Sequence, residues 1–180
     1  MKSSTHEKVF LKAGEVLIAE KPSRIYTILG SCVAVIMFSP RTGIGAICHA
    51  QLAENKETSS RCSDTCPVKC FTQVSKTTQF KYVSCSIRYM VDQFEKRGIS
   101  KKEIDVKLFG GANVLKSGNN QQTIGHQNIE TATKILKNMR LEVISHSVGG
   151  NTGMTLYFDS NTGIVHLKRH KQGNPWRPLL

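Results

Sequence analysis

Short apolar runs separated by turn-forming residues occupy the first third of the chain, a pattern typical of β-strands. Gly14 and Pro22 lie between runs, where they favour a turn over a continued strand. The predicted strands are residues 8–12, 15–20, 25–29, 33–38 and 43–49. This part of the chain is therefore predicted to form β-sheet.

The last two of these runs are predicted to form a β-hairpin. They flank the turn-forming residues 39–42, Ser-Pro-Arg-Thr. With these four residues as the loop, Val35 lies opposite Ala46 and Cys32 lies opposite His49. Directly opposed residues of an antiparallel pair have Cβ atoms about 4.5–5.5 Å apart. The predicted register therefore places a thiol beside an imidazole.

Two stretches after residue 83 have apolar residues at helical spacing. The first, 84–98, ends at Gly98, because glycine favours the left-handed conformation that follows many helices. The second begins at Asn128, which we expect to be its N-cap. Between them, Ser100 and Glu103 have the spacing of a capping box, which predicts a short helical turn. The apolar positions are Ile87, Met90, Val91 and Phe94 in the first helix, and Ile129, Ala132, Ile135, Leu136 and Met139 in the second.

The order of the elements predicts an α+β domain, because a β-rich part is followed by a helix, a strand, a second helix and a β-rich end. The later predicted strands are 104–109, 141–148, 154–158 and 163–168. Residues 54–81 have no sustained apolar period and are predicted to form a long surface loop. A chain of 180 residues buries about 70% of its unfolded surface as one unit. We therefore expect a single domain over residues 1–180.

The composition is that of a soluble globular protein, with 39% hydrophobic and 21% charged residues. No apolar run approaches the ~20 residues of a membrane-spanning helix. Residues 1–8 are polar and lack the apolar segment of a signal peptide. These features predict a cytoplasmic protein that does not insert into a membrane.

The net charge of +12 and the pI of 9.6 are compatible with nucleic-acid binding. The basic residues are, however, spread along the chain, and their densest run is 168–171 near its end. No recognised nucleic-acid motif is present. We therefore predict no nucleic-acid partner, and we expect the charge to form a solvated surface that assists encounter with acidic protein partners.

Cys32 is a candidate nucleophile, with His49 as its base. An isolated thiol has a pKa of about 8.5, and a neighbouring imidazolium lowers this value because it stabilises the thiolate. Gly30 and Ser31 precede the cysteine, where a turn without side-chain bulk can expose backbone N–H groups to an oxyanion. The alternative is a core cysteine, since cysteines next to apolar strand residues such as the Val-Ala-Val after Cys32 are commonly buried.

Three further cysteines, Cys62, Cys66 and Cys70, lie within the predicted surface loop. Six cysteines in a cytoplasmic protein favour metal binding or catalysis over disulfides. Three thiols suit zinc or an iron-sulfur cluster, with Cys85 or a histidine as the fourth ligand. Pro67 disfavours a continuous helix through them. A redox or disulfide role and free surface thiols are the alternatives.

Four motifs follow one another at characteristic intervals: T-I-L-G-S-C-V-A-V at 27–35, G-A-I-C-H-A at 45–50, K-L-F-G-G-A-N at 107–113 and V-G-G-N-T-G at 148–153. In this order they resemble the CheD family, the chemoreceptor glutamine deamidases of bacterial and archaeal chemotaxis. The resemblance extends over residues 9–169. Several separate motifs in one order are far more specific than any one of them.

The resemblance implies that Cys32 is the nucleophile and that His49, seventeen residues later, is its base. It also implies a threonine as the third member of a triad, which is Thr27 here, although Tyr26 aligns instead with some members. The glycine pair 110–111 is implied to lie close to the active site. The implied fold is a β-sandwich-like core of mixed sheets flanked by helices, like the deamidase domain of cytotoxic necrotizing factor.

The implied function is hydrolysis of specific glutamine side chains to glutamate on methyl-accepting chemotaxis receptors, with release of ammonia and no required cofactor. The implied partners are these receptors and the CheC phosphatase. Two alternatives are a non-catalytic adaptor that binds receptors or CheC, and a metal-responsive or redox-responsive regulator that uses the loop cysteines. Loss of ammonia release on replacement of Cys32, with binding preserved, separates the enzyme from the adaptor.

Overall fold

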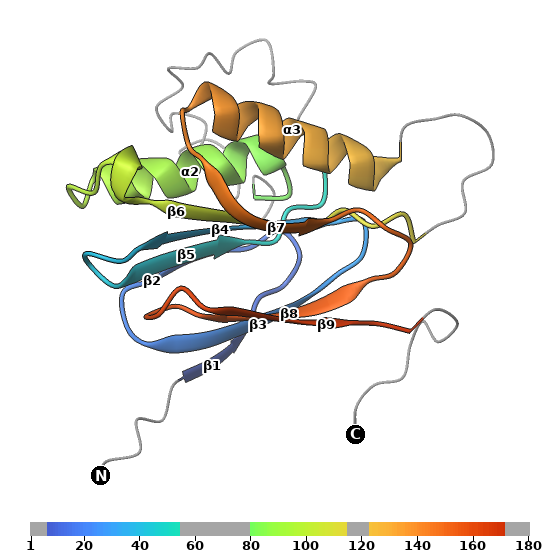
Figure 1. Ribbon diagram of the computed structural model, residues 1–180, viewed down its shortest axis with the longest axis horizontal. Coiled ribbons are helices and arrows are strands. Elements are labelled where there is room, and N and C mark those ends of the chain that lie inside the picture. Colours follow the sequence, from blue (N-terminus) through green and yellow to red (C-terminus); the bar gives the residue numbers. More distant parts are fainter. Residues whose placement is uncertain (1–6, 55–79, 115–122, 172–180) are drawn as a thin grey trace.

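The computed structural model of the chain describes residues 7–54, 80–114 and 123–171, which form nine strands, two α-helices and one 3₁₀ turn (Figure 1). The strands are β1 (Glu7–Phe10), β2 (Val16–Ala19), β3 (Ser23–Leu29), β4 (Val33–Ser39), β5 (Ile44–Cys48), β6 (Asp105–Gly110), β7 (Val143–Val148), β8 (Met154–Asp159) and β9 (Val165–Arg169). The helices are α2 (Val83–Glu95) and α3 (Ile124–Asn138), and the 3₁₀ turn is η2 (Lys101–Glu103). Every predicted strand and helix is present, with shifted ends.

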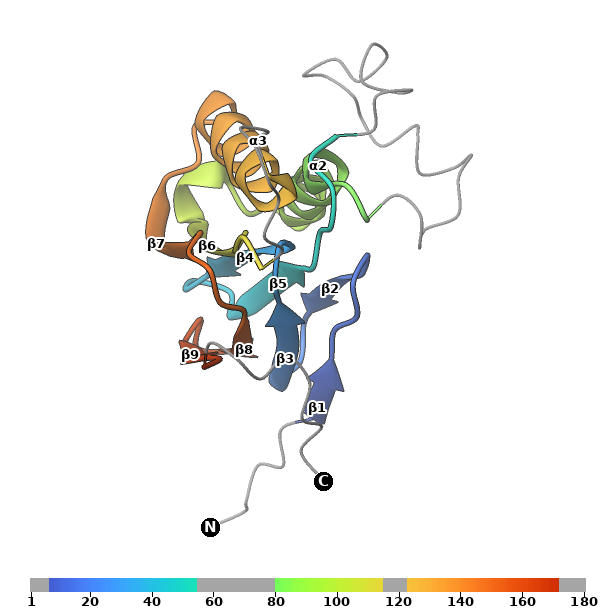
Figure 2. The ribbon, with the colours of Figure 1, turned by 90° about the vertical axis from the view of Figure 1, so that its right-hand side faces the viewer.

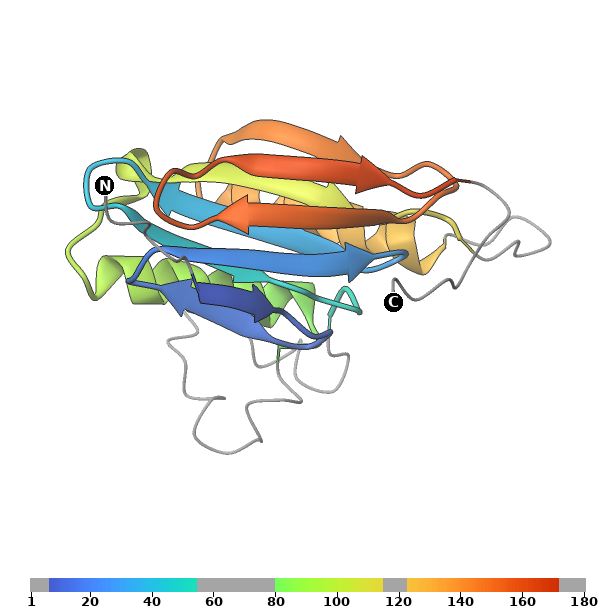
Figure 3. The same cartoon turned by 90° about the horizontal axis from the view of Figure 1, so that it is seen from below.

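The strands form two sheets that pack face to face. The outer sheet has the order β1-β3-β8-β9, and the inner sheet has the order β2-β5-β4-β6-β7. Each sheet is mixed, because β1 pairs with β3 and β6 pairs with β7 in parallel while the other neighbours are antiparallel. Both helices pack on the inner sheet, on its face away from the outer sheet (Figures 1 and 2). Seen from below, the outer sheet lies in front of the inner sheet (Figure 3). These layers confirm the α+β class and the sandwich-like core of mixed sheets.

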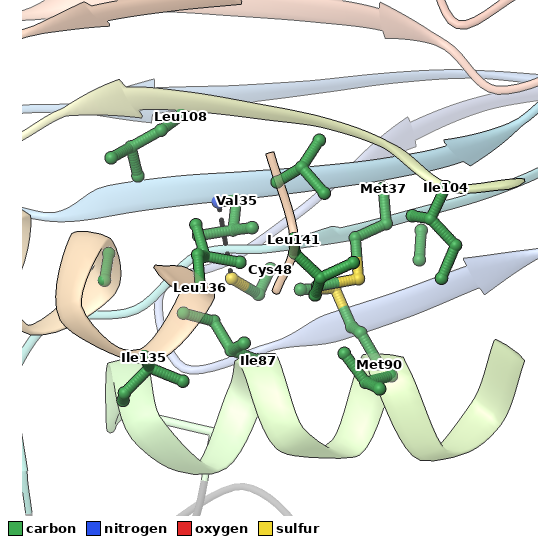
Figure 4. Close-up of a cluster of buried hydrophobic side chains, with 14 of the residues drawn as sticks. Val35, Met37, Cys48, Ile87, Met90, Ile104, Leu108, Ile135, Leu136 and Leu141 are labelled. Atoms are coloured by element: carbon green, nitrogen blue, oxygen red, sulfur yellow. Dashed lines mark hydrogen bonds between the residues drawn. The ribbon is translucent and has the colours of Figure 1, made fainter. Parts of the chain in front are cut away.

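One hydrophobic core lies between the inner sheet and the helices. Val35, Met37 and Cys48 of the sheet lie against Ile87 and Met90 of α2 (Figure 4). The apolar face predicted for α2 is buried as a whole, and burial of each such side chain contributes about 1.5–3 kcal/mol. This core holds the helices on the inner sheet.

The second core fills the space between the two sheets. Ile25 and Phe158 of the outer sheet belong to it together with Ile36 and Phe109 of the inner sheet. Successive residues of a strand point to opposite faces, so β4 supplies side chains to both cores and is buried along its whole length. This explains why residues 33–38 form a continuous apolar run and do not alternate.

The hairpin between β4 and β5 is present, but its predicted loop is wrong by one residue. The loop occupies 40–43, because Gly43 has a φ of 70° and donates its N–H to the Ser39 carbonyl at 2.9 Å. This left-handed conformation suits glycine and takes it out of the strand. The pairs shift with the loop, and Cys32 therefore does not lie directly opposite His49.

The start of α3 also differs from the prediction. The helix begins at Ile124, and Thr123 is the N-cap, whose hydroxyl accepts from the His126 N–H at 3.3 Å. Asn128 lies inside the helix with its side chain buried, so the predicted N-cap is wrong. The apolar stripe led to the right helix, but the one large apolar side chain of its first turn, Ile124, is exposed and does not extend the buried stripe.

The segment between α2 and β6 follows the prediction. Gly98 has a φ of 70° just after the last turn of α2. Ser100 and Glu103 form the capping box of η2, in which the Ser100 N–H donates to the Glu103 carboxylate at 2.8 Å. Within the described residues, neither helix is long and apolar enough to span a bilayer.

Candidate active site

Thr27 of β3 and His49, which follows β5, meet between the two sheets. The Oγ1 of Thr27 lies 2.7 Å from the Nδ1 of His49. Both side chains are buried, with exposed fractions of 0% and 6%. Tyr26 points to the other face of β3, where its ring stacks on Tyr157 with centroids 6.2 Å apart. The geometry therefore favours Thr27 over Tyr26 as the third member of the candidate triad.

The hydrogen bonds around Thr27 assign the proton on the His49 ring. The Thr27 hydroxyl donates its one hydrogen to the Leu11 carbonyl at 2.8 Å, because a carbonyl can only accept. The same hydroxyl must then accept at its contact with His49, so Nδ1 carries the ring hydrogen. The Nε2 atom keeps its lone pair. This tautomer is the one that a general base needs.

The turn between β1 and β2 holds the backbone of His49. The His49 N–H donates to the Glu15 carbonyl at 3.0 Å, and the His49 carbonyl accepts from the Gly14 N–H at 2.8 Å. Burial lowers the pKa of His49 below its ordinary value of 6.5, and the Leu11 carbonyl and the Glu15 carboxylate oppose this in part. The imidazole is therefore neutral at pH 7 and able to accept a proton.

Cys32 and His49 project from the same face of the inner sheet. Val33 and Ala50, the residues that follow them, exchange two backbone hydrogen bonds of 2.9 Å and pack into the core below the helices. Because successive residues point to opposite faces, Cys32 and His49 both point toward the outer sheet. They are diagonal neighbours, a relation in which the two residues of an antiparallel pair are typically about 7–8 Å apart. Among the described residues, the His49 side chain hydrogen bonds with Thr27 and not with Cys32.

The Cys32 thiol is half-buried, and burial raises its pKa above the ordinary value of 9.0, although its own backbone N–H opposes this in part. Burial of both groups therefore disfavours the expected thiolate-imidazolium pair in the free protein and favours a neutral thiol beside a neutral imidazole. Cys48 is fully buried, and burial raises the pKa of its thiol to about 12. Of these two cysteines, Cys32 is the candidate nucleophile and Cys48 is a core residue.

The turn that carries Cys32 is fixed through its carbonyl groups. The carbonyls of Gly30 and Cys32 accept from backbone N–H groups of residues 111–112 at 2.9 and 2.8 Å. The Ser31 carbonyl accepts from the side chain of Asn128 at 3.0 Å. The Cys32 N–H faces its own sulfur, and neither it nor the Ser31 N–H donates to another group among the described residues. The Cys32 donor therefore faces the thiol, and the Ser31 donor belongs to the residue directly before it.

The end of β6 approaches this turn closely. Gly110 has a φ of 98°, and a Cβ at this position would lie 2.3 Å from the carbonyl oxygen of Cys32. The Gly111 N–H bonds to that same oxygen. The prediction that the glycine pair lies close to the candidate nucleophile is therefore confirmed.

The three loop cysteines, Cys62, Cys66 and Cys70, lie outside the described residues. A zinc or iron-sulfur site at these cysteines stays a prediction. The suggested fourth ligand, Cys85, is half-buried on α2. In the part of the chain that the structure describes, no three histidine, cysteine or acidic side chains are placed to hold a metal ion.

Two contributors to this site were not predicted, the carbonyl of Leu11 and the side chain of Asn128. A backbone carbonyl has no residue-type signal in the sequence. Asn128 did have a signal, because it lies four residues before Ala132 and seven before Ile135, on the buried stripe of α3. A polar residue on an apolar helical stripe indicates a buried hydrogen-bonding role.

Known proteins resemble the chain over most of its length. The family model described as CheD chemotactic sensory transduction matches residues 67–169. The "Probable chemoreceptor glutamine deamidase CheD 2" of Geobacter sulfurreducens is 37% identical over 161 residues, which are 89% of this chain and 89% of that protein. The "Probable chemoreceptor glutamine deamidase CheD" of Maridesulfovibrio salexigens is 35% identical over 90% of this chain and 91% of that protein.

Among solved structures, the Bacillus licheniformis hypothetical protein YfiH aligns with a TM-score of 0.43 and 14% identity, over 73% of this chain and 49% of that one. The expected likeness to the deamidase domain of cytotoxic necrotizing factor stays a prediction.

Proposed function

Because the chain belongs to the CheD family, we propose that it deamidates glutamine side chains of chemoreceptors, with Cys32 as the nucleophile and His49 as the general base. The reaction and substrate classes are those named for the curated relatives. The observation on this chain that carries the mechanism is the 2.7 Å contact between Thr27 and His49. With the ring hydrogen on Nδ1, the Nε2 atom of His49 can accept a proton, and His49 projects from the same face of the sheet as Cys32.

In the first half of the reaction, the Cys32 sulfur bonds to the carboxamide carbon of glutamine while Nε2 of His49 takes the thiol proton. The carbonyl oxygen carries the negative charge of the tetrahedral intermediate. As the intermediate collapses, the carbon–nitrogen bond breaks and His49 returns the proton to the departing nitrogen. Ammonia leaves, and the acyl group stays on Cys32 as a thioester.

In the second half, a water molecule attacks the thioester carbon and His49 takes one of its protons. The carbon–sulfur bond then breaks, and the proton returns to the Cys32 sulfur. The product is a glutamate side chain. One water is consumed and one ammonia is released for each glutamine, and the enzyme ends the cycle in its starting state.

The N–H groups of Ser31 and Cys32 are the proposed donors to the oxyanion. Their own carbonyls are bonded to neighbouring segments, which holds the turn in place before substrate binds. Donors that are already oriented require no reorganisation in the transition state, and each is worth about 2.7–4 kcal/mol in comparable sites.

The neutral pair predicts a distinct pH dependence. Burial lowers the pKa of His49 below 6.5, so kcat/KM should stay level near pH 7 and fall only as the pH drops below 6.5 and His49 gains a proton. Burial raises the pKa of Cys32 above 9.0, so alkylation of Cys32 by iodoacetamide should be slow at pH 7 and accelerate at alkaline pH. Peptide mass spectrometry measures the alkylation. Rapid alkylation at pH 6 would instead reveal a thiolate-imidazolium pair.

Removing the Thr27 hydroxyl should slow turnover. In Thr27→Val, His49 loses the acceptor that fixes its tautomer, and we expect kcat to fall about 10–100-fold with little change in KM. Thr155→Val is a matched control, because Thr155 bonds His170 at 2.9 Å outside the site. Steady-state kinetics on a receptor substrate should separate the two variants. Equal losses in both would contradict the assigned role of Thr27.

The proposed function is tested with the purified chain and a chemoreceptor cytoplasmic domain that carries its glutamines. Peptide mass spectrometry should find a gain of about one dalton at glutamine, because an oxygen replaces the amide nitrogen. Ammonia should appear in equal amount. A folded chain that produces neither change on any receptor of its own cell would refute the proposal.

The partner, the location and the metal site also stay proposals. We propose the CheC phosphatase as a partner and the cytoplasm as the location, as the family resemblance implies. The net charge of +12 favours encounter with acidic protein surfaces. Metal analysis of protein purified without oxygen, with the loop cysteines intact and replaced, tests the zinc or iron-sulfur site.

A further inference from the structure

Asn128 is a buried polar residue that joins the two chain segments of the candidate site. It lies on the fifth position of α3, and its side chain has an exposed fraction of 0%. Its Nδ2 donates to the Ser31 carbonyl at 3.0 Å and to the Gln51 carbonyl at 2.9 Å. Ser31 directly precedes Cys32, and Gln51 is the second residue after His49. One amide group thus bonds both segments.

The orientation of the Asn128 amide is defined, because its nitrogen and oxygen cannot exchange places. Both hydrogens of Nδ2 are used, and a reversed amide would place Oδ1 against two carbonyl oxygens. Oδ1 itself is buried and has no hydrogen-bond partner among the described residues. A buried acceptor without a partner disfavours folding, so stability alone is a poor account of this residue. What the amide provides is a fixed distance between two carbonyl groups.

The helix that carries Asn128 is itself fixed against the site. Gly125 packs so closely on the turn after β6 that a Cβ there would lie 2.4 Å from the Gly111 carbonyl oxygen. Gly111 in turn donates to the carbonyl of Cys32 at 2.8 Å. The helix is thus packed closely against the turn that bonds to Cys32, and Asn128 reaches the Ser31 and Gln51 carbonyls from this packed element.

We propose that Asn128 is a positioning residue for deamidation, which holds the Cys32 segment against the His49 segment so that the thiol proton can pass to Nε2. The inference rests on the proposed function. The bonds between Val33 and Ala50 join the same two segments within the sheet, and Asn128 joins them from the helix side. Diagonal neighbours need this second tie, because a small shift changes their separation directly.

The test compares two α3 variants by steady-state kinetics on a receptor substrate. Asn128→Leu keeps the side-chain volume and removes both donors, and kcat should fall at least 30-fold while KM stays within threefold. Leu136→Ala removes buried apolar contacts from the same helix, so it should lower thermal stability but keep kcat within threefold of the wild type. If Asn128→Leu does not fold, Asn128→Asp replaces it, because it has the same shape and also loses the donor pair.

Two results would overturn the inference: a folded Asn128 variant with kcat within threefold of the wild type, or a loss of kcat in Leu136→Ala as large as that in the Asn128 variant.

A second readout does not depend on deamidation. In an otherwise wild-type chain, His49→Ala should change the rate at which iodoacetamide alkylates Cys32, and the ratio of the two rates measures the coupling between the two residues. In the Asn128→Leu background this ratio should be at least fivefold smaller. If the wild type fails to deamidate receptors but shows this coupling, the proposed function fails and the positioning role stands. If deamidation occurs and the coupling is unchanged, the positioning role fails alone.

Discussion

Replacing Cys32 with alanine should abolish glutamine deamidation and leave the protein folded. The sulfur is the atom that bonds to the carboxamide carbon, and no other group at the site can take its place, because His49 is held as the base by Thr27. Loss of a nucleophile of this kind lowers kcat by a factor on the order of 10⁶. The thiol is only half-buried, so its removal should cost less than about 1 kcal/mol of stability.

Ammonia release and the mass of receptor glutamines measure this effect, and thermal unfolding reports the fold. Cys85→Ala is the matched control, because Cys85 is also half-buried but lies on α2. It should keep full activity. Receptor binding should survive in Cys32→Ala. Deamidation that persists in Cys32→Ala would remove the proposed mechanism, and binding without deamidation in the wild type would favour the adaptor.

Several elements of the fold could be predicted because their apolar residues recur at a helical or strand period. The buried face of α2 repeats at helical spacing, and β8 alternates buried with partly exposed residues along its whole length. β4 was predictable for a different reason, since only a strand between two cores is apolar at every position. Where the period is weak, as in the first turn of α3, the prediction placed the N-cap five residues late, at Asn128 and not at Thr123.

The register of the hairpin could not be predicted from residue types. Loops at 39–42 and 40–43 have nearly the same composition, and the positive φ of Gly43 selects the second. Moving a four-residue loop by one position shifts each strand pair by two residues. A shift of two preserves the face on which each side chain lies. This is why Cys32 and His49 still share a face, although they are diagonal neighbours.

The ionisation of the site depends on what covers it, which local sequence does not record. A thiol beside an imidazole suggests an ion pair, but packing against the outer sheet buries both groups and disfavours both charges. The Leu11 carbonyl is equally invisible in sequence, because its role arises from the turn between β1 and β2. These contributions come from tertiary contacts between segments that are distant along the chain.

Replacing Gly110 with alanine should damage both stability and activity. The φ of 98° is unfavourable for any residue with a Cβ, at about 1–2 kcal/mol, and the added Cβ would lie 2.3 Å from the Cys32 carbonyl oxygen. Crowding of this kind costs a further 1–3 kcal/mol, roughly, because neighbouring backbone must shift. We expect a total loss of about 2–5 kcal/mol in the free energy of unfolding, measured by denaturant titration.

The backbone that must shift to accommodate this Cβ is that of the nucleophile itself, since the other close atoms belong to Leu29 and Val33 on either side of the turn. A displacement of about 1 Å at a reacting group lowers turnover about 10²-fold, so kcat of Gly110→Ala should fall by at least that factor at temperatures where the variant is folded. Gly98→Ala is the matched control: its φ of 70° carries a similar backbone penalty, but no atom lies within 4 Å of the added Cβ. It should lose stability and keep kcat. If both variants keep kcat, the Cys32 turn is not held by its contact with β6, and the oxyanion donors proposed for it lose their structural support.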